Sequence, residues 1–112
     1  MSETPDIQRV VKYFESLQSE ICRTLETFDG QSSFSLEEID TAGGGHSRPR
    51  VLDAGAHIER GAVQFTHSIG AALPPAASER NPHLAGKGFQ AAAISMIMHP
   101  QNPWVPTFHA NL

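Results

Sequence analysis

Apolar side chains recur every three or four residues near the amino end, which is the spacing of one face of an α-helix. Thr4 before Pro5 has the form of an N-cap followed by the first helical position, and Asp6 suits the positive end of the helix dipole. Asp29 and Gly30 then supply a stop signal. We therefore predict an amphipathic helix over 5–28, with an apolar stripe of Ile7, Val10, Val11, Phe14, Leu17, Ile21, Leu25 and Phe28.

The second half of the chain has the pattern of short strands. Between 51 and 70, roughly alternating apolar and polar segments are interrupted by glycines, and the apolar segment 89–98 is followed by the proline-rich loop 100–106 and a further strand at 107–112. These features predict an antiparallel sheet within 49–112 that packs with the helix as a single domain over 1–112, of the α+β class. The stretch 70–88, rich in proline and glycine, is expected to be an irregular loop such as a lid or binding loop.

Polar side chains alternate along the last two predicted strands. A loop symmetric about Pro103 would set His99 opposite Thr107, Ile97 opposite His109, and Ser95 opposite Asn111. His99, His109, Ser95 and Asn111 would then share one side of the sheet, with the histidines roughly 7–8 Å apart at the backbone. A slip of one residue would separate them, and spacing alone favours two capping or structural histidines. Two histidines without a nearby cysteine or acidic residue complete no familiar metal site.

Other residues that could carry chemistry have simpler explanations as well. Arg48 and Arg50 follow a glycine run and could bind a carboxylate ligand through bidentate hydrogen bonds, or could be solvated residues of an edge strand. His67 is more readily a hydrogen-bonded structural histidine than a catalytic one. Cys22 lies beside the apolar stripe of the predicted helix, so we interpret it as a packing residue.

Composition excludes several functional classes. The chain has 112 residues with 8 Lys and Arg against 12 Asp and Glu, a formal charge of -4 that argues against a nucleic-acid binder. Its longest mostly apolar run, AAAISMIM, is too short for a membrane span. The amino end lacks the pattern of a secretory signal, and a single cysteine excludes an intramolecular disulfide. A cytoplasmic location is the simplest expectation.

The segment 99–111 reads HPQNPWVPTFHAN, and it resembles a motif of the oxygen-dependent coproporphyrinogen-III oxidases. The segments AGGGHSRPRV, GAVQFTHSIGAALPP and GKGFQAAAISMIMHP resemble the same family in the same order, so the similarity covers nearly the whole chain. Two positions depart from the family pattern. The serine usual before the second histidine is Phe108, and the serine usual before His67 is Thr66.

The resemblance implies an enzyme that oxidatively decarboxylates two propionates of coproporphyrinogen III to vinyl groups, giving protoporphyrinogen IX in haem biosynthesis. Molecular oxygen would be the electron acceptor, no organic cofactor would be needed, and a divalent metal such as manganese is proposed for some members. The family forms homodimers on a large antiparallel sheet flanked by helices.

By the same resemblance, particular positions acquire expected roles. His109 is expected to be the proton donor and, with His99, a metal ligand. Ser95 and Asn111 are expected to contact the substrate, and Arg48 and Arg50 would suit its carboxylates.

The family pattern continues well beyond the last of these motifs, so we expect this chain to be the front part of a longer protein. A non-catalytic tetrapyrrole-binding or dimer-forming fragment, and a purely structural one, are the alternatives to an active enzyme.

Overall fold

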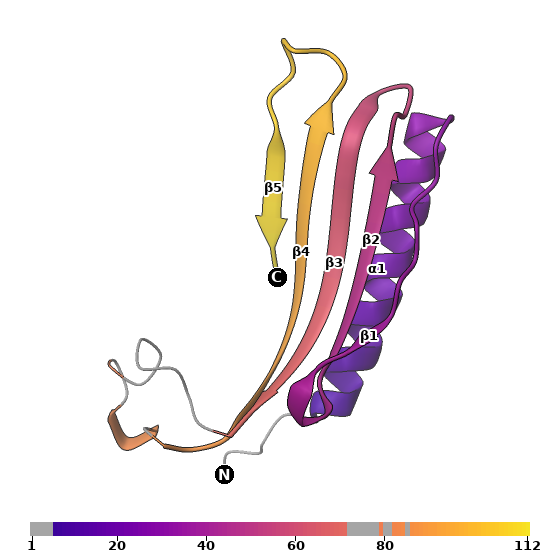
Figure 1. Ribbon diagram of the computed structural model, residues 1–112. Helices are drawn as coiled ribbons and strands as arrows, with labels where there is room; N and C mark the ends of the chain where they lie inside the picture. The colour runs from indigo at the N-terminus through magenta and orange to yellow at the C-terminus, as the bar shows by residue number, and fades with distance from the viewer. Residues whose placement is uncertain (1–5, 72–78, 80–81, 85) are drawn as a thin grey trace.

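The computed structural model describes residues 6–71, 79, 82–84 and 86–112 and contains one α-helix packed on one antiparallel sheet (Figure 1). The α+β class is therefore confirmed. The sheet has five strands in the order β1-β2-β3-β4-β5, and each strand runs antiparallel to its neighbours. The elements are α1 (Ile7–Asp29), β1 (Ile39–Asp40), the 3₁₀ turn η1 (Ala42–Gly44), β2 (His46–Asp53), β3 (Ile58–Gly70), the 3₁₀ turn η2 (Pro82–Leu84), β4 (Phe89–Pro100) and β5 (Phe108–Asn111).

The sheet starts earlier in the chain than expected. The sheet begins at Ile39, before the expected region 49–112, because β1 pairs with the start of β2. The expected loop 70–88 lies largely outside the described residues. No helix in the described part of the chain is both long enough and apolar enough to cross a bilayer.

The two ends of α1 are defined by short-range hydrogen bonds. The N-cap is Asp6, whose carboxylate accepts a hydrogen bond from the N–H of Gln8 at 3.0 Å. The expectation that Thr4 caps the helix is therefore wrong, because aspartate is at least as good a cap and lies next to the first helical turn. At the other end, Gly30 has φ 76° and donates its N–H to the carbonyl of Glu26 at 2.9 Å. The stop predicted at Asp29 and Gly30 is confirmed.

The core lies between α1 and one face of the sheet. Because side chains alternate along a strand, β3 turns Val63 and Phe65 toward the helix, and β4 turns Ile94 and Met98 the same way. Figure 1 shows α1 running along the sheet, and its main contacts are with β3 and β4. The buried apolar residues are Cys22, Phe34, Leu52, Ile58, Val63, Phe65, Ile94 and Met98.

A buried glutamine ties the helix to two strands. Gln18 is fully buried, and its side-chain amide donates to the carbonyls of Arg48 at 2.6 Å and Val63 at 2.9 Å. These two carbonyls belong to β2 and β3, so a single side chain holds α1 at one position along both strands. Buried polar groups need such partners, because an unmade hydrogen bond in the core costs about 1–3 kcal/mol.

A buried carboxylate connects the end of α1 to the turn between β2 and β3. Asp29 is 3% exposed, and its two oxygens accept hydrogen bonds from five backbone N–H groups at 2.9–3.3 Å. The donors are Gln31, Ser32, Ala56, His57 and Ile58. Burial disfavours the charged carboxylate, but backbone N–H groups outweigh it and lower the pKa of Asp29 well below its ordinary value. A β-carbon at Gly55 would overlap this carboxylate, which accounts for the glycine.

We expect Asp29→Asn to lower the midpoint of thermal unfolding, measured by circular dichroism at neutral pH. The amide keeps one acceptor oxygen but turns an NH₂ group toward backbone donors, leaving buried donors unpaired. Glu20→Gln, which removes an exposed carboxylate from the same helix, is the matched control and should leave the midpoint unchanged. Equal midpoints for the wild type and Asp29→Asn would contradict the anchoring role.

The same carboxylate predicts a pH dependence with a definite sign. Since the folded-state pKa of Asp29 lies below its ordinary value of 3.8, its stabilisation is complete above that value and is lost as the pH falls through the folded pKa. The stability difference between the wild type and Asp29→Asn should stay constant from about pH 5 to 8 and shrink below about pH 4. A difference that grows on acidification would contradict this assignment.

Cys22 should be unreactive while the chain is folded. Its side chain is 0% exposed, and burial raises the pKa of the thiol to about 11. We expect a maleimide or disulfide reagent at pH 8 to label the folded chain at least roughly a hundredfold more slowly than the chain in guanidinium chloride. Equal rates in the two conditions would show that Cys22 is not a packing residue.

Candidate functional site

The face of the sheet opposite α1 carries most of the polar side chains of β2 to β5. We call it the polar face, and three of the rows that the strand registers form across it lie beside the β4–β5 hairpin. The first row is Asp53, Arg60, His99 and Thr107; the second is Val51, Ala62, Ile97 and His109; the third is Pro49, Gln64, Ser95 and Asn111.

The register predicted for the last hairpin is confirmed. Ser95 pairs with Asn111 and Ile97 pairs with His109. His99 lies near Thr107, with 3.4 Å between the imidazole Nδ1 and the hydroxyl. The turn is stabilised at its start, where the Asn102 side chain accepts the N–H of Trp104 at 2.9 Å. Ser95, His99, His109 and Asn111 therefore share one side of the sheet, as the symmetric loop predicts.

These four side chains are exposed to solvent. Within the described residues, the side chains of Ser95, His109 and Asn111 make no hydrogen bond to another protein group, so their donors and acceptors are available to a ligand. The middle row places the small Ala62 and the aliphatic Ile97 between the two polar rows. The result is an open surface with an apolar row between two polar rows.

Arg48 and Arg50 lie on the other side of the sheet. Arg48 pairs with Phe65 and Arg50 with Val63, so both point to the side that α1 covers. The Arg48 guanidinium lies 3.4 Å from the Glu15 carboxylate and donates to Ser19 at 3.1 Å. Arg50 donates to the carbonyl of Ser35 at 3.0 Å. The structure thus does not bring these arginines together with the histidines, and their substrate-binding role stays a prediction.

The polar face also contains residues that the sequence pattern does not predict as site residues. Arg60 lies directly opposite His99 on the neighbouring strand, and Gln64 lies opposite Ser95. The Gln64 amide also donates to the Ser47 hydroxyl at 3.0 Å. Alternation within 51–70 is visible in the sequence, but the pairing of β3 with β4 is needed to place these residues beside the histidines.

His67 behaves as a structural residue, as expected. It is 8% exposed, and its Nε2 lies 3.0 Å from the side-chain oxygen of Gln90. Its position in the register puts it on the α1 side, opposite Ala92, and away from the polar face.

The described residues do not form a complete metal site. His99 and His109 supply two nitrogen donors on one face, whereas an ion such as Mn²⁺ takes about six ligands. Among the residues that the structure describes, no group of three or more histidine, cysteine, aspartate or glutamate side chains could hold a metal ion. We therefore assign no chemical step to a metal on these residues.

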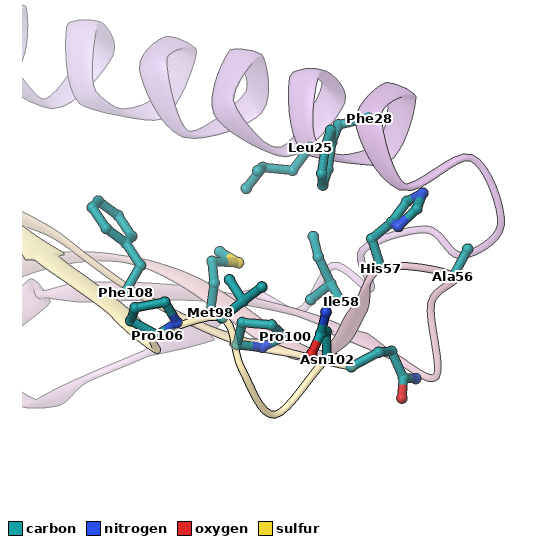
Figure 2. A pocket seen from close by; sticks show the side chains of 12 residues that line it. Leu25, Phe28, Ala56, His57, Ile58, Met98, Pro100, Asn102, Pro106 and Phe108 are labelled. Carbon is teal, nitrogen blue, oxygen red and sulfur yellow. The ribbon is translucent and has the colours of Figure 1, made fainter.

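A groove of about 410 Å³ lies on the opposite side of the sheet, between the end of α1 and the β4–β5 hairpin. Figure 2 shows Leu25 and Phe28 above it and Met98 and Phe108 facing them from the sheet. Its lining is mostly apolar, and it contains none of the predicted site residues. Phe108, which departs from the family pattern, thus adds apolar surface to the side away from His109.

A comparison with protein families agrees with the motifs in the sequence. The family model described as coproporphyrinogen III oxidase matches residues 9–112, which is almost the whole chain and includes every residue of the polar face. The residues that carry the resemblance, from Ser95 to Asn111, are the ones that the hairpin register gathers on one open surface. The chain belongs to the coproporphyrinogen III oxidase family.

Proposed function

We propose that the polar face is one wall of a binding site for coproporphyrinogen III, and that this chain serves its oxygen-dependent conversion to protoporphyrinogen IX. The observation that carries the proposal is the placement of Ser95, His99, His109 and Asn111 on one exposed surface in a chain of this family. The family match alone supports an oxidoreductase of porphyrin and haem biosynthesis.

The surface suits a flat ligand with charged margins. Residues two apart on a strand are separated by roughly 7 Å, so the outer rows of the polar face lie roughly 13 Å apart. A tetrapyrrole ring could rest on Ala62 and Ile97 while its side chains reach the polar rows. Ser95 and Asn111 would hydrogen-bond at one margin, and His99 would lie at the other.

The proposed reaction removes carbon dioxide and two electrons from each of two propionates. A hydrogen with its electron pair leaves the propionate carbon next to the ring, and the bond to the carboxylate carbon breaks to leave a vinyl group and carbon dioxide. Oxygen takes this hydrogen with its electron pair and one proton from solvent, and becomes hydrogen peroxide. His109 would hold or move a proton at the pyrrole or at the reacting propionate, because histidine is well suited to proton transfer near neutral pH.

The proposal also covers the cofactor, the metal ion and the oligomeric state. No organic cofactor is required for the balance above, since oxygen accepts the electrons. A bound divalent ion such as manganese would act as a Lewis acid, and it would need ligands besides His99 and His109. A homodimer is the proposed assembly.

A second candidate function follows from the openness of the polar face. Ser95, His99, His109 and Asn111 are exposed, so a tetrapyrrole bound there would stay in contact with water, whereas catalysis would need that water excluded. This alternative is a non-catalytic tetrapyrrole-binding or dimer-forming chain. Binding and turnover therefore have to be measured separately.

For turnover, we expect the chain incubated with coproporphyrinogen III in air to form protoporphyrinogen, measured as protoporphyrin fluorescence after oxidation. His109→Ala should lower kcat by about 10²–10⁴-fold, the usual contribution of a general acid or base. His46→Ala, an exchange on the α1 side of the sheet, is the matched control. Full activity in His109→Ala would remove the proposed role, and tight binding without turnover would favour the non-catalytic alternative.

For binding, coproporphyrin III is a stable probe that carries the same four propionates. We expect Ser95→Ala and Asn111→Ala each to weaken its binding by roughly three- to tenfold, the effect of losing one hydrogen bond. Fluorescence titration gives the dissociation constants. Ser16→Ala, on the exposed surface of α1, is a control of the same chemistry, and equal weakening by all three variants would contradict a site on the polar face.

A further inference from the structure

The polar face carries one permanently charged cation among its described strand residues. Among the described residues of β2 to β5, Arg60 is the one arginine or lysine on this face. Its side chain is 69% exposed. A ligand with four carboxylates that binds this surface would therefore find the strongest positive charge of the surface at Arg60.

The contacts of Arg60 leave most of its hydrogen-bonding capacity unused. Asp53, its partner across β2 and β3, lies 3.4 Å from Nε through one carboxylate oxygen. Both side chains are exposed, and an ion pair in such a setting contributes little stability. The pair instead orients the guanidinium and leaves its two Nη groups for a bidentate contact with a carboxylate.

The position of Arg60 matches the proposed site. It lies directly opposite His99 and in the first row of the polar face, whereas Gln64, four residues further along the same strand, lies in the third row beside Ser95. A carboxylate held by Arg60 would therefore project from the margin opposite Ser95 and Asn111. This placement leaves the apolar centre of the surface for the ring.

We propose that Arg60 is the carboxylate-binding residue of this surface, taking one propionate of the tetrapyrrole through its Nη groups while Asp53 holds its orientation. The inference rests on the proposed function. It differs from the untested expectation for Arg48 and Arg50, whose guanidinium groups contact Glu15, Ser19 and Ser35 on the opposite side of the sheet.

Titration of the full chain with coproporphyrin III tests this proposal. Arg60→Gln should weaken binding about tenfold, because a charge-assisted bidentate contact is lost. Arg60→Lys should lie between the wild type and Arg60→Gln, since lysine keeps the charge but not the planar fork. Arg23→Gln, which removes a charge from the exposed side of α1, should bind like the wild type. Unchanged thermal midpoints establish that each variant folds.

A second probe distinguishes a contact between Arg60 and a propionate from non-specific binding of the porphyrin ring. The tetramethyl ester of coproporphyrin III has the same ring without negative charge, and Arg60→Gln should bind it as the wild type does. Added salt should reduce the difference between the wild type and Arg60→Gln for the free acid, because screening weakens exposed charge pairs.

The outcomes distinguish this inference from the proposed function. Weakening by Ser95→Ala and Asn111→Ala with no effect of Arg60→Gln would overturn the role of Arg60 and leave the site in place. Weakening by Arg50→Gln rather than Arg60→Gln would move the carboxylate contact to the other side of the sheet. A wild-type chain that binds no coproporphyrin III would overturn the proposed function and the role of Arg60 together.

Discussion

The two-residue repeat of a β-strand, combined with a helix on only one side, determines where every side chain of this sheet lies. Antiparallel registers carry the alternation from β2 through β5, so a residue that faces α1 on one strand places its partners toward α1 as well. The apolar set closes the core, and the other set forms the polar face. A slip of one residue between β4 and β5 would separate His109 from the histidine and serine of β4.

The helix is positioned by polar contacts as much as by apolar packing. An apolar stripe can slide or rotate on a sheet at modest cost, whereas Gln18 and Asp29 accept few alternative placements because both are buried among backbone groups. Gln18 bonds to carbonyls of two strands, and Asp29 bonds to N–H groups of the next hairpin. Together they specify where the core begins and ends along the sheet, and hence which face remains open.

The sequence predicts the helix and the last hairpin because both depend on local patterns. The stripe of α1 is a repeat within one element, and the symmetric loop around Pro103 relates two strands that are close in the chain. The face occupied by Arg48 and Arg50 depends instead on how β2 meets β3 through the turn that Asp29 organises, and a strand pattern does not reveal that register. Arg60 was missed for the same reason, since its closeness to His99 arises only when β3 pairs with β4.

Fewer backbone pairs attach β5 to the sheet than attach the interior strands β3 and β4 to each other. The pairing of β5 with β4 covers four residue pairs, whereas β3 and β4 pair over most of their length, and among the described strands β5 has a neighbour on one side only. Short edge strands detach by local opening at a smaller free-energy cost than global unfolding. His109 and Asn111 belong to this strand, so fraying there would disassemble the site while the core beneath α1 stays intact. Loss of function on warming would then precede melting, and the amides of β5 would exchange faster than those of β3 and of the β3-paired part of β4.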